Sequence, residues 1–327
     1  MGVRAAGIGF FLLTLNIAAN APADRFEWQA PQADHVDLDF DGKPVLRYEM
    51  PTLDESSEQT RNDTFKPYHQ VFSPDGQTLL TKGTGGLFPH HRGLFYGFNK
   101  ISYGDGKQCD MWHCTGKTFQ SHEEVIEQTA DDDSASQVVA IDWHGQEGEL
   151  FAHETREIEV RRTKHDSVDG WQIDFASHLE TADGKPIHLD GDPQHAGFQF
   201  RATQKVPDET AAETYYLRTD GRGQPGDYRN WDHENPAAKE NAENENRPWN
   251  AMSFVVDGQR FTVLYLDHPS NPKPARYSER DYGRFGSYFV ADVTKDEPLD
   301  VKYRLWVQPG EMTVEECATL SQQFISE

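Results

Sequence analysis

The chain of 327 residues holds 31 Lys and Arg against 55 Asp and Glu, which gives a formal net charge of −24. We expect no nucleic-acid partner, because binding to phosphates needs a basic face. The three cysteines, Cys109, Cys114 and Cys317, are too few for a scaffold held by disulfides, although Cys109 and Cys114 could pair across a short loop. Stability must therefore come from a hydrophobic core, for which the chain is long enough.

The N-terminus has the layout of a secretory signal. Arg4 precedes an apolar-rich run that ends at Ala19, and this run is shorter than the roughly 20 residues of a membrane span. A small-x-small triplet predicts cleavage after Ala23, so residues 1–23 are interpreted as a signal peptide, with an uncleaved anchor as the alternative. No later segment is apolar enough to cross a bilayer. We expect a periplasmic or extracellular protein with no integral membrane segment after cleavage.

The rest of the chain, residues 24–327, alternates apolar and polar residues with the period of half-buried strands. In chain order, this pattern predicts strands at 45–50, 137–143, 171–175, 198–201, 254–256, 261–265 and 299–307. Asp257-Gly258 supplies the positive φ that a tight hairpin needs. One helix is predicted from Thr313 to about Phe324, where Glu316 completes a capping box. These elements predict one all-β domain, an antiparallel β-sandwich with a short C-terminal helix.

Between about residues 220 and 250 the periodicity stops, and the chain fills with Gly, Asn, Glu and Pro. We interpret this stretch as a long irregular insertion in the sandwich. Both a lid over a functional site and a solvated insertion fit its composition.

The densest group of reactive side chains lies in segment 83–97, where glycines surround His90, His91 and Arg92. Glycines let the backbone bend closely, imidazoles carry protons or bind metals, and a guanidinium is a fixed cation. On a strand, His90 and His91 would face opposite ways, so at most one would point into a given site.

Three later segments add candidates. In segment 109–114, Trp112 is of the type that stacks on a sugar ring, His113 follows it, and Asp110 could hold a neighbouring His or Arg. The spacing of the two cysteines there is not that of a zinc knuckle.

Segment 188–201 is a turn rich in carboxylates that leads into a strand. It carries His195 at the strand entry and Arg201 along it, whereas turn geometry alone explains Asp190 and Asp192.

Segment 271–286 concentrates Arg276, Glu279 and Tyr282 with further arginines. Such a set could bind a polyhydroxylated or carboxylated ligand, with Glu279 as acid or base. A surface network of ion pairs is the alternative.

Together these segments resemble the PmoA-like family of unknown function, from about Lys66 to Gly310. The resemblance rests on Lys66-Pro67-Tyr68, Ser73-Pro74-Asp75-Gly76, Pro89-His90-His91-Arg92-Gly93-Leu94, Asp110-Met111-Trp112, His195-Ala196-Gly197-Phe198-Gln199-Phe200-Arg201 and Tyr282-Gly283. The family name suggests a methane oxygenase, but the chain has none of the membrane spans of a particulate monooxygenase, so we do not adopt that activity.

More loosely, a His-bearing loop in the first third, a second His farther on and a carboxylate near the end resemble the galactose mutarotase-like β-supersandwich. This resemblance implies that His91 and His195 act as acid or substrate-orienting groups, that Glu279 is the base and that Arg92 grips substrate oxygens. It is a resemblance of layout, and fold does not determine function.

The leading hypothesis is a secreted enzyme that acts on a sugar or oligosaccharide by acid-base chemistry, as a hydrolase, a lyase or an epimerase. It needs no cofactor, and its substrate contacts would come from Trp112, His113, Arg201, Arg276 and Tyr282. One alternative is a non-catalytic glycan-binding protein with a stacking platform of Trp112, Trp231 and Trp249. The other is a metalloenzyme with zinc or copper on His90, His91, His113 and His195.

Overall fold

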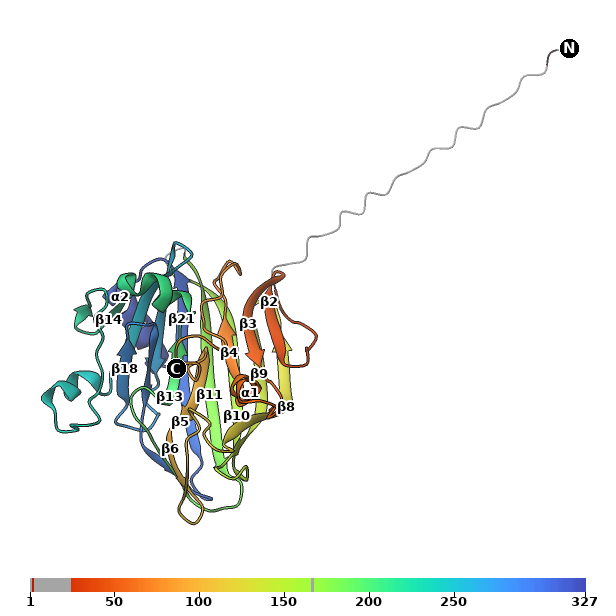
Figure 1. Cartoon of the computed structure of the whole chain (residues 1–327). Coiled ribbons are helices and arrows are strands. Elements are labelled where there is room, and N and C mark those ends of the chain that lie inside the picture. Colours follow the sequence, from red (N-terminus) through yellow and green to blue (C-terminus); the bar gives the residue numbers. More distant parts are fainter. Residues whose placement is uncertain (1, 3–24, 166–167) are drawn as a thin grey trace.

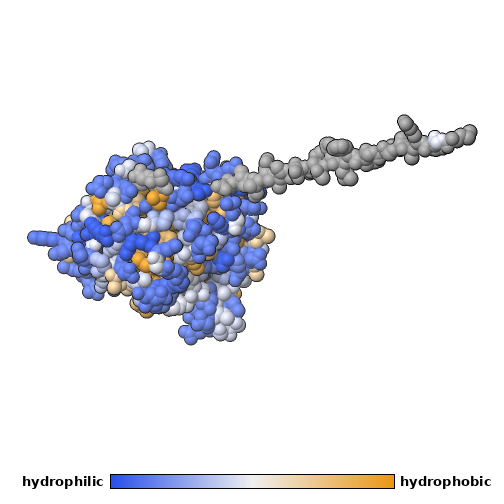
Figure 2. All heavy atoms as spheres, turned by 90° about the horizontal axis from the view of Figure 1, so that it is seen from above, coloured by the Kyte–Doolittle hydropathy of each residue, from blue (hydrophilic) through white to orange (hydrophobic). Residues whose placement is uncertain are grey.

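The computed structural model describes residues 2, 25–165 and 168–327. The predicted signal peptide therefore lies, apart from Gly2, outside the described residues. Within them, no helix is long and apolar enough to cross a membrane. The outer surface is mostly hydrophilic, with scattered apolar side chains, on the face that Figure 2 shows.

The described chain forms three antiparallel β-sheets and few helices. The first sheet has the strand order β1 (Phe26–Trp28), β2 (His35–Phe40), β3 (Lys43–Glu49), β4 (Tyr68–Val71), β5 (Leu94–Phe98), β13 (Ala196–Arg201), β19 (Arg284–Tyr288) and β18 (Arg276–Arg280). The second has the order β15 (Gly221–Arg222), β14 (Tyr215–Arg218), β16 (Trp249–Val256), β17 (Gln259–Asp267), β21 (Leu299–Pro309), β11 (Val168–Thr181), β10 (Leu150–His165), β9 (Ser134–His144) and β8 (Phe119–Ala130). The third is small, with β20 (Ala291–Val293), β12 (Ile187–Asp190), β6 (Lys100–Tyr103) and β7 (Lys107–Cys109).

The two large sheets pack face to face as a sandwich (Figure 1). Aromatic rings join them in the core: Phe175 of β11 stacks on Phe198 of β13 with ring centroids 4.3 Å apart, and Tyr303 of β21 lies 5.0 Å from Phe198. Burial of these large apolar surfaces is the main force that holds the layers together. The predicted antiparallel β-sandwich is confirmed.

Helix α1 (Glu58–Thr64) lies between β3 and β4 in the chain, and α2 (Val314–Ile325) ends it. The predicted capping box of α2 is present, since the Thr313 side chain accepts from the amide of Glu316, whose carboxylate accepts from the amide of Thr313. α2 covers a second apolar cluster on the second sheet that includes Trp306, Leu320 and Phe324. Short helical turns occupy Val206–Thr210, Ala211–Glu213 and Lys239–Asn244.

The predicted strands all lie within observed ones, except that the strand predicted at 45–50 passes the end of β3 by one residue, Met50. The hairpin between β16 and β17 turns at Asp257 (φ 51°) and Gly258 (φ 75°), with Val256 paired to Gln259. Cys109, Cys114 and Cys317 are free and buried, so no disulfide joins Cys109 to Cys114. That residues 24–327 form a single domain stays a prediction.

The segment predicted as an irregular insertion lies along β18, at one edge of the first sheet (Figure 1). Isolated bridges attach it there, from Asn230 to Ser278 and from Glu245 to Arg276. Apart from β15 and the turn at Lys239–Asn244, it has little regular structure before β16 begins at Trp249.

Candidate active site

Four imidazoles from three separate loops converge beside the first sheet, near Trp112 and Phe95 of β5. We call His90, His91, His113 and His195 the histidine cluster. The His90 ring centroid lies 4.4 Å from that of His91, 4.4 Å from that of His113 and 5.3 Å from that of His195. His195 in turn lies 5.1 Å from His91 and 4.5 Å from His113. Residues more than 100 positions apart in the chain thus form one compact centre.

His90 and His91 belong to a turn that precedes β5, and not to a strand. The amide of His91 donates to the carbonyl of Phe88 at 3.0 Å, and Phe88 itself adopts a positive φ of 52°. The turn removes the alternation of a strand, so both rings face the same centre. The expectation that at most one of them could point into a site is therefore wrong.

Two buried lysines hold the backbone of this turn. The Lys66 ammonium donates to the carbonyls of His90 at 2.9 Å and of Trp112 at 2.6 Å, and so ties two loops of the cluster together. Lys82 donates to the carbonyl of His91 at 3.3 Å. Burial lowers the pKa of both lysines to about 7.

The other two histidines are held by the same local device, an Asp-x-x-His turn. In one turn the Asp110 carboxylate accepts from the amides of Trp112 and His113, and its second oxygen lies 2.7 Å from His113 Nδ1. In the other, Asp192 accepts from the amide of Gln194 at 2.9 Å and lies 2.9 Å from His195 Nδ1. An ionised carboxylate only accepts hydrogen bonds, so Nδ1 carries the proton in both rings and Nε2 keeps a free lone pair.

The environment keeps three of the imidazoles, those of His90, His91 and His195, neutral near pH 7. Burial, reinforced by His113 and Lys66, lowers the pKa of His90 to about 2. Burial and the Arg284 guanidinium hold the pKa of His91 well below its usual value. Burial also lowers the pKa of His195, although Asp192 opposes the shift. Neutral imidazoles can take up a proton or bind a metal.

Burial raises the pKa of the Asp192 carboxyl, but hydrogen bonds from His195, Gln194 and Asn99 outweigh it and leave the pKa below its usual value. Asp192 therefore stays ionised beside the histidine cluster.

The cluster is reached from outside. A pocket of about 200 Å³ is lined by Asn62, Phe65, Pro89, His90, Arg92 and His113. Beside it, the exposed ring of Phe88 lies 4.9 Å from that of Tyr282, and both lie 6.1 Å from His91. This aromatic pair offers a solvent-facing apolar surface next to the imidazoles.

Gly93 allows the turn to join β5. It adopts a φ of +29°, and an added Cβ would overlap the carbonyl oxygen of His69 on the neighbouring strand β4. We expect Gly93→Ala to lower the free energy of unfolding by about 1–3 kcal/mol more than Gly85→Ala, because overpacking adds to the backbone strain. Gly85 is a matched control, with a φ of +72° and no atom within 4 Å of an added Cβ. Urea denaturation measures both, and equal losses would contradict the steric argument.

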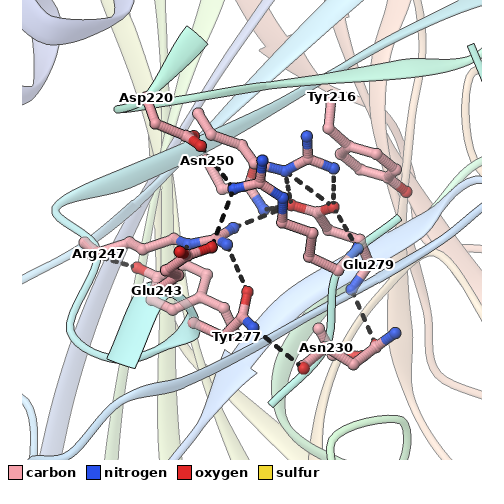
Figure 3. Close-up of polar contacts among 12 residues, drawn as sticks. Tyr216, Asp220, Asn230, Glu243, Arg247, Asn250, Tyr277 and Glu279 are labelled. Carbon is pink, nitrogen blue, oxygen red and sulfur yellow. Dashed lines mark hydrogen bonds and ion pairs between the residues drawn. The ribbon is translucent and has the colours of Figure 1, made fainter. Parts of the chain in front are cut away.

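Glu279, the predicted base, is part of a different centre. Its carboxylate is fully buried on β18 and accepts hydrogen bonds from Arg218, Arg247, Asn250 and the amide of Arg229 (Figure 3). Among the described residues, no hydrogen bond, ion pair or ring contact joins it to the histidine cluster. A fully buried carboxylate whose two oxygens are already engaged by these donors has no open position at which to meet a substrate. The structure thus corrects the expectation for Glu279, because this residue anchors the insertion to β18. The alternative of an ion-pair network fits better, although the network is buried and not on the surface.

Arg92 is also engaged in structure. It is 1 % exposed, and its three guanidinium nitrogens donate to the carbonyls of Pro89, Asp63 and Asn62. It therefore fastens the turn to α1, and the expectation that it grips substrate oxygens is wrong for this geometry.

Trp112 is 1 % exposed and packs against His91, Phe95 and Lys66, so it cannot stack on a ligand in solution. Trp231 and Trp249 are buried as well. The predicted stacking platform of these three tryptophans is therefore absent.

The remaining predicted contacts divide into two groups. Tyr282 and His113 lie at the cluster, and Arg201 lies behind Tyr282, with its guanidinium carbon 5.0 Å from that ring. Arg276 lies apart, 4.3 Å from the ring of Trp231 under the insertion.

Two functional features were missed in the sequence. Asp192 was assigned to turn geometry alone, whereas it orients the imidazole of His195. The signal was in the sequence, because Asp110 precedes His113 by the same three positions by which Asp192 precedes His195. Lys66 and Lys82 gave no local signal, because their partners are carbonyls that only the fold brings near.

The solved structures that match the chain do so at low similarity. A family 97 glycoside hydrolase from Pseudoalteromonas sp. strain K8, solved in complex with acarbose, matches with 10% identity and a TM-score of 0.33 over 88% of this chain, which spans 34% of that enzyme. A putative mutarotase from Salmonella typhimurium matches with 10% identity and a TM-score of 0.33, over 86% of this chain and 96% of the other. A galactose mutarotase related enzyme from Lactobacillus acidophilus matches with 10% identity and a TM-score of 0.32, over 75% of this chain and 95% of the other.

No curated protein matches the chain in sequence. The resemblance to a PmoA-like family finds no support in these matches and stays a prediction. Residues 35–322, most of the chain, match the model of a family of unknown function, and the protein therefore belongs to that family, DUF6807.

Proposed function

We propose that the protein is a secreted enzyme that processes a sugar or oligosaccharide by acid-base chemistry at the histidine cluster. The observation that carries the proposal is the convergence of four imidazoles, two of which are oriented by carboxylates in Asp-x-x-His turns. A histidine whose Nδ1–H is bonded to a carboxylate presents Nε2 as a base, and the carboxylate stabilises the imidazolium that forms.

The assignment of roles follows from the neighbours of each ring. His195 and His113, each 3.0 Å or less from an aspartate, are the proton acceptors and donors. His91 is almost fully buried and packs against both Trp112 and His195, so it acts from the floor of the site. Glu279 has no part in the proton transfer.

The choice of a sugar is supported by the aromatic pair at the rim. The exposed Phe88 and the half-buried Tyr282 give an apolar face beside polar imidazoles, the combination that suits a pyranose ring with its apolar face and hydroxyl edge.

The test is a panel of neutral and acidic oligosaccharides, with detection of new reducing ends, unsaturated products and epimers. We expect one of these products from at least one glycan. Binding without any product would support a glycan-binding protein instead. Neither binding nor product across the panel would overturn the choice of a sugar.

A further inference from the structure

We propose that His90, His91 and His195 form a binding site for one transition-metal ion of the zinc or copper type. Each of the three residues offers a ligand atom, and these atoms all lie within 4.8 Å of one another. The proposal concerns the same residues as the sugar-processing function, but it stands on geometry and is tested by metal binding. While an ion occupies His195 Nε2, that nitrogen cannot take up a proton, and the proton transfer falls to His113.

The first argument is the state of the buried nitrogens. His90 Nε2 and His91 Nδ1 are buried, and within the described residues neither has a hydrogen-bond partner. His91 as a whole is only 1 % exposed. Buried polar groups in proteins are paired in the large majority of cases, so two orphaned imidazole nitrogens in one cluster point to a ligand.

The second argument is the orientation of the third ligand. His195 Nδ1 is bonded to the Asp192 carboxylate, which leaves Nε2 for a metal. Histidine ligands of metals usually donate their other ring nitrogen to a carboxylate or carbonyl in this way, because the bond fixes the tautomer and raises the basicity of the ligand. His113 has the same arrangement with Asp110 and adjoins the site as a fourth imidazole.

The donor set selects the class of metal. Three neutral imidazoles suit zinc and copper, whereas calcium and magnesium require oxygen ligands. Nitrogens at bonds of 2.0–2.1 Å around a tetrahedral ion are about 3.3 Å apart, so the ligand atoms, which lie within 4.8 Å of one another, need to close by up to about 1.5 Å. The turn that carries His90 and His91 and the turn that carries His195 are separate loops, which allows this closure.

The charges around the site indicate which ligand would fill the coordination position that the three histidines leave free. Asp110 and Asp192 contribute negative charge next to the imidazoles, but Arg201 and Arg284 lie buried behind them and have no carboxylate partner in the described part of the chain. A dication in this setting favours an anion, such as hydroxide, at the coordination position that the three histidines leave free.

The experiment uses the full mature protein, stripped with a chelator and then titrated with zinc and with cobalt as a spectroscopic substitute. We expect one ion per chain with micromolar or tighter affinity and cobalt absorption bands typical of tetrahedral coordination. His195→Gln and His90→Gln should each weaken binding at least tenfold. Both variants keep a polar side chain of similar size, and circular dichroism checks their folding.

Two control variants locate the ion. His188→Gln removes a histidine that pairs with Asp292 on the exposed third sheet, and it should leave binding unchanged. His144→Gln removes a member of the other group with metal-ligand spacing, Glu123, Asp142 and His144, and should also leave it unchanged.

The proposal fails if the wild-type protein binds neither metal, or if binding persists in the His195 and His90 variants. Loss of binding in the His144 variant alone would equally overturn it. If glycan turnover persists in chelator, the sugar-processing function stands and does not depend on the metal. If the protein binds metal but turns over no glycan, the metal site stands and the sugar-processing function is overturned.

Discussion

Glu279→Ala is expected to lower the free energy of unfolding by about 3–5 kcal/mol, the loss seen when one partner of a buried ion pair is removed. The carboxylate is 0 % exposed, and it is the common acceptor for the guanidiniums of Arg218 and Arg247, at 2.5–3.1 Å from the first and 3.0 Å from the second. Without it, two buried cations lose their counter-charge. Equilibrium denaturation in urea measures the change.

Asp281→Ala is the matched control, because Asp281 is an exposed acid only two residues along the chain. Its effect should stay within about 0.5 kcal/mol. The insertion of residues 220–250 should also become more sensitive to protease in Glu279→Ala, since Arg229 and Arg247 tie it to Glu279. Native stability combined with lost turnover would instead restore Glu279 as a catalytic group.

His195→Gln is expected to lower turnover of the processed glycan by about 10²–10⁴-fold, the usual range for the loss of a general acid or base. The physical reason is that glutamine cannot cycle a proton at the position of Nε2, while its amide can still bond to Asp192. The native fold should persist, since the His195 side chain is 19 % exposed and lies at the rim of the core. Turnover and thermal unfolding measured on the same preparation separate the two effects.

Asp192→Asn refines this expectation. Asp192 is a positioning residue, so the variant should keep substrate affinity, lower kcat by a smaller factor than His195→Gln and change the pH profile of kcat/KM. His188→Gln is the control, because its exposed histidine has a similar pairing, 2.7 Å from Asp292, away from the cluster. Equal activity in His195→Gln and His188→Gln would contradict the assignment.

The strands could be predicted because their pattern is local. Val301, Tyr303, Leu305 and Val307 are buried on β21, and the alternation of Leu299 to Val307 follows the pleat of that strand. The hairpin at Asp257-Gly258 and the capping box at Thr313 were likewise visible, because each depends on residues no more than four positions apart.

The site was only partly predictable, because its geometry is not local. His90, His91, His113 and His195 were all recognised as candidates, but their convergence depends on the pairing of β5 with β13 and on the loop that Lys66 fastens. Glu279 and Arg92 were misjudged for one reason. The sequence shows that a side chain is charged, but not that partners from other segments of the fold already engage it.

A crystal structure of the protein with its processed glycan bound tests the central claim, that the histidine cluster is the functional centre. The account predicts a sugar ring against Phe88 and Tyr282, with an oxygen about 2.6–3.2 Å from Nε2 of His195 or His113, the reach of a general acid or base. A sugar bound elsewhere, with no contact to any of the four imidazoles, would contradict it.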